Sequence, residues 1–188
     1  MKTLVVGGGA VGLACAIELA QAGHKVVVAE RHAALGSETS SRNSGVIHAG
    51  MYYPTSSLKA RLCVEGRAML LRFCERRRVP YKLCGKLIVG HGVVDAAKLE
   101  QILVRSRANQ VEVPLQHWSG AQVIERFANV RATEALWSAG TGIIDSHAFI
   151  AALAATLRRR DGVLLIGTEV LRLTTGRSGW HARLQTGR

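Results

Sequence analysis

The chain has 188 residues, a formal net charge of +12 at pH 7, 48% hydrophobic residues and 5% aromatic residues. This length suits one ordinary domain or two small ones. No apolar run reaches the ~18 residues of a membrane-spanning helix, and the few aromatic residues argue against a nucleic-acid surface built on base stacking. The arginine runs 76–78 and 158–160 fall where helices should end, so we interpret the positive charge as a solvated surface.

The N-terminal residues predict a βαβ unit with two parallel strands. Lys2 to Val6 is a short apolar strand, Ala10 to Ala22 has the apolar spacing of a helix, and Lys25 to Ala29 is a second buried strand closed by Glu30. The first apolar run is too short for a signal peptide because it breaks at once into three glycines, so we expect a cytoplasmic protein.

Helices and strands follow in alternation. The predicted helices span Ser57 to Arg77, Ala96 to Asn109, Ser119 to Phe127 with Ser119 as N-cap, and a last helix capped by Ser146 that continues to Arg160. The predicted strands span Tyr81 to Val89, Ala135 to Ile144, Val163 to Ile166, Glu169 to Leu173 and Trp180 to Gln185. No element follows to flank the parallel strands, so we interpret the C-terminus as a truncation.

Three glycines between the first strand and the first helix form a G-x-G-x-x-G fingerprint. Gly7 permits a tight turn, Gly9 lets the backbone approach a pyrophosphate, and Gly12 lets the helix pack closely on the strand. The pyrophosphate would lie on the helix N-terminus, which Ala10 and Val11 begin. This arrangement predicts a dinucleotide site.

The residues after the second strand favour FAD as the dinucleotide. Glu30 stands where an acid accepts the ribose hydroxyls, which argues against the 2′-phosphate of NADP. The polar loop from Arg31 to Gly50 is rich in hydrogen-bond donors, especially from Ser40 to Gly45, and such a nest suits the second polar contact of a flavin.

Several segments resemble the D-amino-acid-oxidase-like FAD-dependent oxidoreductases. They are Val5 to Gly12, Glu30-Arg31, Ser41 to Tyr53, Thr141 to Asp145 and Gly167 to Val170. Within that group, Asn43 to Tyr53, Ser57 to Ala60 and Leu62 to Gly66 most resemble the L-2-hydroxyglutarate dehydrogenase (oxidase) family. The likeness covers essentially the whole chain.

The resemblance implies an α/β fold, α+β overall. A Rossmann-like FAD-binding domain would be interleaved with part of an antiparallel-sheet substrate domain. Residues 1–80 and 146–188 would belong to the FAD-binding domain and residues 81–145 to the substrate domain.

The resemblance also implies a set of cofactor-binding residues, with the backbone of the last one holding the adenine. They are Gly7, Gly9, Ala10, Val11, Gly12, Glu30, Arg31, Ser41, Arg42, Asn43, Ser44, Gly45, Val46, His48 and Val170.

The implied reaction is oxidation of L-2-hydroxyglutarate or a related 2-hydroxy acid to the 2-oxo acid, with hydride transfer to the flavin. It needs a base for the hydroxyl proton and cations for the carboxylates. His48 is the candidate catalytic base because imidazole transfers protons near neutral pH; a hydrogen bond to the flavin is its alternative role. Tyr52, Tyr53 and Lys59 are candidates for the substrate side, and no metal-binding cluster stands out.

Two other functions remain open at this point. One is an amine, amino-acid or glycerol-phosphate oxidase of the same fold, and the other is an inactive truncated fragment. The expected partners are a small 2-hydroxy acid and an electron acceptor, either a quinone or oxygen, without nucleic acid. A quinone acceptor would go with a peripheral association with the inner membrane.

Overall fold

The chain folds into two compact units. The computed structural model describes residues 1–177 and 179–187. The first unit comprises Met1–Ser44 and Asp145–Arg188, and the second comprises Gly45–Ile144. The second unit is therefore inserted into the first. Residues 45–80, which we expected in the FAD-binding domain, group by contact with the second unit.

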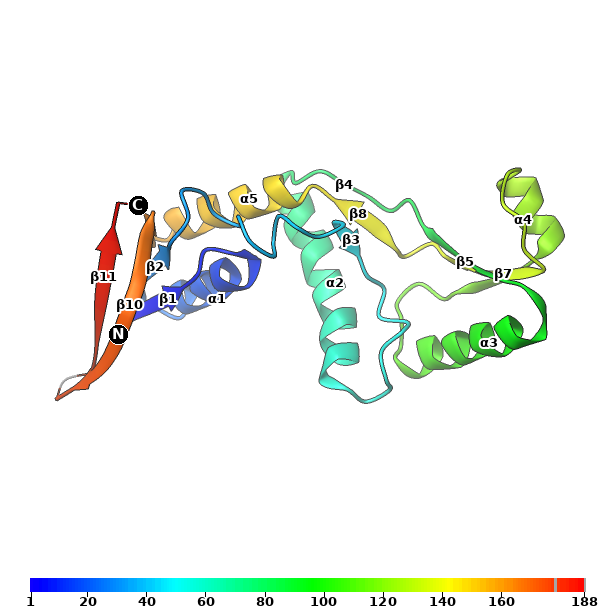
Figure 1. The fold of residues 1–188 in the computed structure, drawn as a ribbon, viewed down its shortest axis with the longest axis horizontal. Helices are drawn as coiled ribbons and strands as arrows, with labels where there is room; N and C mark the ends of the chain where they lie inside the picture. Colours follow the sequence, from blue (N-terminus) through cyan, green and yellow to red (C-terminus); the bar gives the residue numbers. More distant parts are fainter. Residues whose placement is uncertain (178, 188) are drawn as a thin grey trace. The chain divides into compact units, whose positions relative to one another are not determined.

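A parallel three-stranded sheet and two helices build the first unit (Figure 1). Its central strand β2 buries Val26, Val28 and Ala29, because β1 and β9 flank it and α1 packs beside it. Helices α1 and α5 also pack against each other. The elements are β1 (Lys2–Val6), α1 (Ala10–Gln21), β2 (Lys25–Glu30), α5 (Ser146–Arg158) and β9 (Val163–Ile166), and the strand order is β1-β2-β9.

An antiparallel hairpin completes the first unit. It pairs β10 (Thr168–Gly176) with β11 (Gly179–Thr186), and the pairing slips between Val170 and Arg172. The slip is a β-bulge, which bends a strand locally. Both hairpin strands are longer than predicted.

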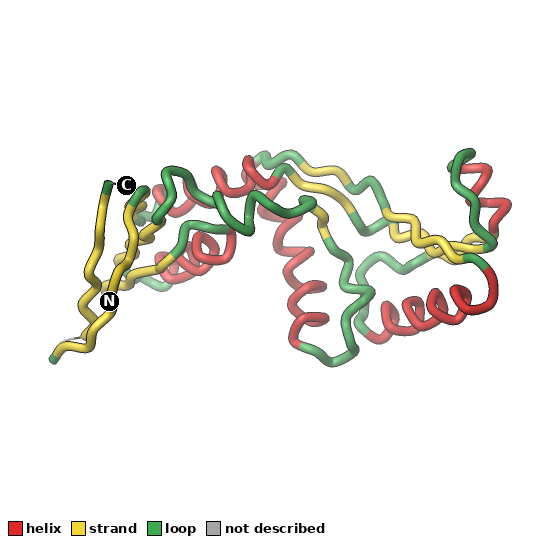
Figure 2. The backbone as a smooth tube through the Cα atoms, in the orientation of Figure 1, coloured by secondary structure: helices red, strands yellow, loops and turns green. Residues whose placement is uncertain are grey.

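Two small antiparallel sheets and three helices build the second unit, which Figure 2 shows in yellow and red. One sheet has the order β3-β8-β4 and the other β5-β7-β6. The elements are β3 (Val46–Ile47), α2 (Leu58–Arg77), β4 (Tyr81–Lys82), β5 (Lys86–Gly90), α3 (Gly92–Ala108), β6 (Gln116–Ser119), α4 (Gly120–Arg126), β7 (Glu134–Ser138) and β8 (Gly142–Ile144). The core of this unit consists of Ala49, Met51, Leu99, Leu103, Leu115 and Leu136. It joins the segment after β3 to helix α3.

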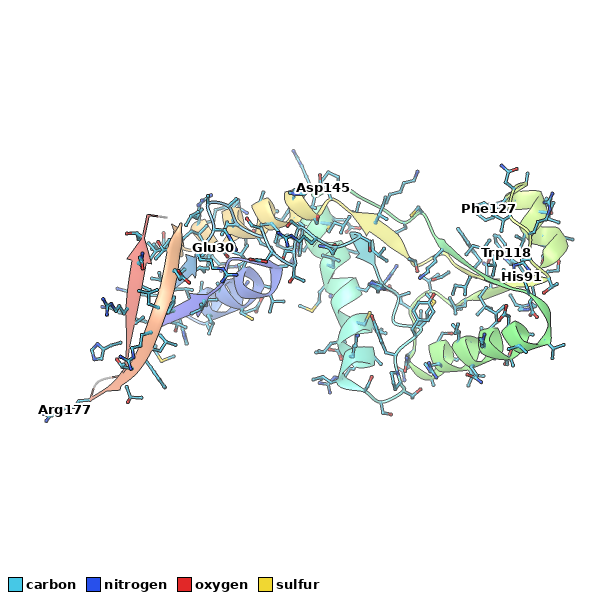
Figure 3. All side chains as sticks on the ribbon, viewed as in Figure 1. Glu30, His91, Trp118, Phe127, Asp145 and Arg177 are labelled. Atoms are coloured by element: carbon cyan, nitrogen blue, oxygen red, sulfur yellow. The ribbon has the colours of Figure 1, made fainter. Side chains whose placement is uncertain are left out.

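The strand predicted from Tyr81 to Val89 is in fact two strands, β4 and β5. Gly85 separates them, with a φ of +75° that interrupts extended backbone. A Cβ at Gly85 would lie 2.1 Å from the Trp137 ring, so the bare Cα is also needed for packing. Trp137 stacks on Trp118 with ring centroids 5.2 Å apart, and Phe127 lies beside Trp118 (Figure 3).

The strand predicted from Ala135 to Ile144 is likewise divided into β7 and β8. The chain turns between them, and the Ser138 and Thr141 hydroxyls lie 2.9 Å apart inside the turn. The two-residue strand β3 was not predicted.

The predicted helices are all present, with two corrections at their N-termini. Helix α3 begins at Gly92 rather than Ala96. Helix α5 is capped by Asp145 rather than Ser146, because the Asp145 carboxylate accepts a hydrogen bond from the Ala148 N–H at 2.9 Å. Ser119 caps α4 as predicted. In the described part of the chain, no helix combines the length and apolar character needed to cross a membrane.

Candidate functional site

The turn between β1 and α1 brings helix and strand into close contact. Gly7 has a φ of +102°, which favours glycine. A Cβ on Gly12 would lie 2.1 Å from the Gly7 carbonyl oxygen, so α1 can start this close to the turn only with glycine there. The structure therefore gives these two glycines the roles that the fingerprint predicted.

The N-terminus of α1 presents free hydrogen-bond donors. Its N-cap, Gly9, has no side chain to cap the helix. The Ala10 N–H donates to the Ser40 hydroxyl at 3.0 Å, whereas the Val11 and Gly12 N–H groups have no protein acceptor among the described residues. Free N–H groups and the positive end of the helix dipole bind an anion, which fits a pyrophosphate.

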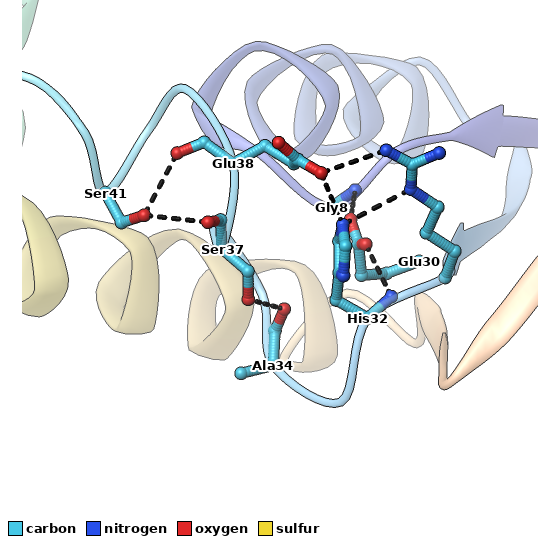
Figure 4. Close-up of polar contacts among 8 residues, drawn as sticks. Gly8, Glu30, His32, Ala34, Ser37, Glu38 and Ser41 are labelled. Carbon is cyan, nitrogen blue, oxygen red and sulfur yellow. Dashed lines mark hydrogen bonds and ion pairs between the residues drawn. The ribbon is translucent and has the colours of Figure 1, made fainter. Parts of the chain in front are cut away.

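Glu30 is held at the end of β2 by the backbone (Figure 4). Its side chain accepts from the Gly8 N–H at 2.7 Å and from the His32 N–H at 2.9 Å, and the residue is 8% exposed. A carboxylate has about four acceptor positions, so two remain for other donors. The geometry fits an acid that accepts ribose hydroxyls beside the glycine turn.

Arg31 pairs with an acid of its own loop. Its guanidinium lies 2.9 Å from Glu38, and the His32 ring lies 2.7 Å from the same carboxylate. The hydrogen bond from Arg31, followed by that from His32, lowers the pKa of Glu38. Glu38 therefore stays charged, and the pair ties the start of the loop to its middle.

The polar side chains further along this loop bond to the loop itself. The Ser41 hydroxyl donates to the carbonyls of Ser37 and Glu38, and the Asn43 amide donates to the Ser40 carbonyl at 2.6 Å. These side chains therefore shape the loop, while Arg42 and Ser44 are exposed. Val170 lies at the bulge of β10 and pairs with Leu184.

The predicted site residues divide between the two units. Those up to Ser44, and Val170, belong to the first unit. Gly45, Val46, His48, Tyr52, Tyr53 and Lys59 belong to the second. In the second unit, β3 pairs with β8, and the Gly45 carbonyl accepts from the Ile144 N–H at 2.8 Å. This pairing sets the direction of the segment that follows.

Side chains at the C-terminal end of helix α3 bond to main-chain carbonyls of the segment from Gly50 to Tyr53. Arg105 donates to the Tyr52 carbonyl at 3.0 Å. The Asn109 amide donates to the Gly50 carbonyl at 3.0 Å and to the Tyr53 carbonyl at 2.9 Å. The two tyrosines thus stand on a backbone that is fixed at three carbonyls.

A small open pocket lies along this segment. Its cavity volume is about 10 Å³, room for about one water molecule, and it is lined by His48, Ala49, Gly50, Met51, Tyr52, Tyr53, Lys86 and Thr141. The Lys86 Nζ lies 4.8 Å from the centroid of the Tyr52 ring, and the Lys59 Nζ lies 4.5 Å from that of the Tyr53 ring. The pocket lining therefore combines an imidazole, two tyrosines and one cation, Lys86, while Lys59 lies over the ring of the lining residue Tyr53.

The environment of His48 favours its neutral form. His48 is an exposed residue, but partial desolvation lowers the pKa of its imidazole below the ordinary value of 6.5, and the charges of Lys86 and then Lys59 lower it further. Cys63 lies behind the segment, 3.8 Å from the His48 carbonyl, and burial raises the pKa of its thiol. A neutral imidazole can accept a proton at neutral pH.

Three features of the site were missed at the sequence level. They are the Ser40 hydroxyl on the helix N-terminus, Lys86 in the pocket, and the pair Arg105 and Asn109 on α3. Ser40 lies in the polar loop that we singled out, so only its direct contact was missed. For the other three residues the sequence carries no local signal, because each reaches the segment from a distant element.

The family model described as "DAO: FAD dependent oxidoreductase" matches residues 2–188. A mitochondrial L-2-hydroxyglutarate dehydrogenase of Arabidopsis thaliana is 40% identical over 153 residues, covering 81% of this chain and 32% of that protein. An L-2-hydroxyglutarate dehydrogenase of Salmonella houtenae is 30% identical, covering 98% of this chain and 44% of that protein.

Solved structures show the same fold. The FAD-bound L-α-glycerophosphate oxidase of Mycoplasma pneumoniae superposes with a TM-score of 0.90 at 29% identity, covering 98% of this chain and 49% of that one. Glycine oxidase from Geobacillus kaustophilus superposes with a TM-score of 0.84 at 26% identity, covering 96% and 50%. The chain thus spans half or less of the length of these relatives.

The family match over nearly the whole sequence agrees with the glycine turn, the buried acid after β2 and the interleaved units. The chain belongs to the DAO family of FAD dependent oxidoreductases.

Proposed function

We propose that the protein is an FAD-dependent dehydrogenase or oxidase that converts L-2-hydroxyglutarate, or a related 2-hydroxy acid, to the 2-oxo acid. The observation that carries this proposal is the pocket lined by His48, Lys86 and the two tyrosines, with Lys59 over the Tyr53 ring. A base and two cations are what oxidation of a hydroxy acid requires. The likeness to L-2-hydroxyglutarate dehydrogenases supports this substrate class.

The chain's own residues would act on the proton and the charges. His48 accepts the proton of the substrate hydroxyl as the C–O bond becomes a carbonyl. Lys59, Tyr52 and Tyr53 bind and orient the acid. FAD, when bound, would supply the hydride acceptor, and a quinone or oxygen would be the final electron acceptor.

The first unit provides the FAD-binding residues in this proposal. The N-terminus of α1 takes the pyrophosphate on its free N–H groups, and Glu30 takes the ribose hydroxyls with its remaining acceptor positions. The segment from Val163 to Val170 returns to the same unit, where the Val170 backbone would hold the adenine. The second unit provides the substrate side.

The alternative is an amine, amino-acid or glycerol-phosphate oxidase. The structural likeness to a glycerophosphate oxidase and a glycine oxidase favours it. Lys86 lines the pocket, and no acidic residue is among the lining residues, which favours an anionic substrate over a free amine. We also propose a cytoplasmic location for the protein. If a quinone accepts the electrons, the protein would associate peripherally with the inner membrane.

Two absorbance measurements test this function. The first is the visible spectrum of the purified chain with added FAD, where resolved flavin bands show that the chain holds the cofactor. The second is anaerobic bleaching of the bound flavin by L-2-hydroxyglutarate, by amino acids and by glycerol 3-phosphate. Bleaching by L-2-hydroxyglutarate is the expected result. If the chain does not bind FAD, the proposed function would apply only to a longer protein. If only amino acids or only glycerol 3-phosphate bleach the flavin, the proposed substrate is wrong.

A further inference from the structure

Two buried hydroxyl groups lie at the wall of the small pocket in the second unit. Thr141 lines that pocket together with His48 and Lys86. The Thr141 hydroxyl lies 2.9 Å from the hydroxyl of Ser138, and the two residues are 5% and 0% exposed. Among the described residues, neither hydroxyl has another hydrogen-bond partner.

Burial decides which hydroxyl donates to the other. The pair has two hydroxyl protons and one hydrogen bond, so one proton is left over. If Thr141 donated, the leftover proton would belong to the fully buried Ser138, and a buried donor without an acceptor is unfavourable. If Ser138 donates, the leftover proton belongs to Thr141, which lines the pocket. The favoured arrangement therefore leaves the Thr141 O–H free to donate to a ligand.

The backbone around Thr141 is held from two sides. The Gly140 carbonyl accepts from the buried Arg67 guanidinium at 2.9 Å, and the Thr141 carbonyl accepts from the Gly85 N–H at 2.9 Å. Gly85 directly precedes Lys86, which lines the same pocket. The free donor is thus fixed in place before a ligand binds, and such pre-organisation lowers the cost of binding.

The pocket has room for a single oxygen atom. Its volume of about 10 Å³ suits one water molecule, whereas a carboxylate, with two oxygens, is larger. On a 2-hydroxy acid, the oxygen on C2 fits this space. In the proposed reaction this oxygen gives its proton to His48 and becomes a carbonyl oxygen, which accepts hydrogen bonds.

We propose that Thr141, oriented by Ser138, donates a hydrogen bond to the C2 oxygen of the substrate. Thr141 is then a binding group of a one-oxygen subsite, and Ser138 is a positioning residue that acts through it. The inference rests on the proposed function, since it takes the pocket beside His48 as the place where the acid reacts.

Isothermal titration of the full chain with FAD tests the subsite. The ligands form two pairs, 2-oxoglutarate with glutarate and pyruvate with propanoate, and the members of each pair differ by the oxygen on C2. None of the four carries a hydroxyl to be oxidised, so binding is measured without flavin reduction. The ratio of the two dissociation constants in a pair reports the contact with this oxygen, whereas a general disturbance of the fold weakens both members alike.

The wild-type chain should bind the oxo acid of at least one pair more tightly than its partner. Thr141→Val should reduce this preference by about 3- to 10-fold, the loss expected for one neutral hydrogen bond, and Thr141→Ser should retain it. Thr156→Val is the matched control, because it removes a similarly buried hydroxyl from helix α5, and it should leave the preference unchanged.

The double variant Ser138→Ala/Thr141→Val guards against misfolding. Thr141→Val alone leaves the Ser138 proton buried without an acceptor, whereas the double variant replaces both hydroxyls by apolar groups. It should lose the same preference as Thr141→Val while its circular dichroism spectrum stays that of the wild type.

Ser138→Ala tests the direction of the hydrogen bond. Without its donor the Thr141 hydroxyl is no longer oriented, so the preference for the oxo acid should fall, but by less than in Thr141→Val. A preference that rises in Ser138→Ala would overturn the proposal, because Ser138 would then have been accepting the Thr141 proton.

An unchanged preference in Thr141→Val would also overturn the proposal, as would a wild-type chain that shows no preference or binds none of the four acids. Flavin reduction by L-2-hydroxyglutarate is measured separately. If it fails while the preference for an oxo acid depends on Thr141, the proposed substrate is wrong and the one-oxygen subsite stands.

Discussion

Replacing Gly12 by alanine should separate helix α1 from the turn that precedes it. The new Cβ would lie 2.1 Å from the Gly7 carbonyl oxygen, and real Cβ atoms essentially never approach closer than 3.0 Å. Either helix α1 or the Gly7 carbonyl must therefore move by about 1 Å. The obstacle is backbone, so no side-chain rotation can relieve it.

The change in the free energy of unfolding follows from two opposing effects. Overpacking of this kind costs about 1–3 kcal/mol. Alanine in place of glycine inside a helix returns about 1 kcal/mol. The difference is a net loss of about 0–2 kcal/mol, and a rigid carbonyl that must shift places it towards the upper end. FAD binding should weaken as well, since the donors at the helix N-terminus move with the helix.

Urea unfolding followed by circular dichroism measures the stability, and flavin fluorescence measures FAD binding. The control is Gly66→Ala in helix α2, where a Cβ meets nothing within 4 Å. That variant should be more stable by about 0.5–1 kcal/mol and should bind FAD as the wild type does. If both alanines shift the unfolding midpoint in the same direction, close packing does not explain Gly12.

Three further changes test the remaining structure. Arg67→Met should destabilise the chain by about 2–4 kcal/mol in urea titrations, because this buried guanidinium donates to the Gly140 carbonyl. Glu112→Gln, which changes the exposed ion-pair partner of Arg67, should cost less than about 1 kcal/mol. Equal losses in the two variants would contradict this account. Because the pKa of His48 is lowered below 6.5, the unfolded chain binds this proton more readily, so stability should decrease as the pH falls below 6.5. His48→Gln should flatten that decrease in urea midpoints between pH ~5 and ~7.5, and an unchanged slope would exclude the effect. Asp145→Ala should cost about 1 kcal/mol in thermal unfolding and Ser146→Ala close to nothing; the reverse order would assign the cap to Ser146.

The βαβ unit could be predicted from the sequence because its signals are local. Gly7, Gly12 and Glu30 act through their own backbone or through residues next to the same turn, so spacing along the chain carries the information. The Ser119 cap is local in the same sense. The parallel strands were found for the same reason.

Other features depend on contacts that spacing does not encode. Asp145 and Ser146 are adjacent, and both residue types cap helices, so the choice between them depends on the path of the chain into α5. Gly85 divides a strand through its positive φ, and the Trp137 ring packed against it leaves no room for a Cβ. Lys86 reaches the pocket only because β5 and the segment after β3 lie side by side in the fold. These are tertiary contacts between residues far apart in sequence.

Helix α3 fixes the backbone of the segment from Gly50 to Tyr53, and this affects how the specificity of the pocket can change. Arg105 and Asn109 bond to main-chain carbonyls, which every residue type possesses. Substitutions at Tyr52 and Tyr53 would therefore alter the chemistry of the pocket wall and leave the path of its backbone in place. The side chains that line the pocket can therefore be exchanged one at a time while the backbone beneath them keeps its hydrogen bonds.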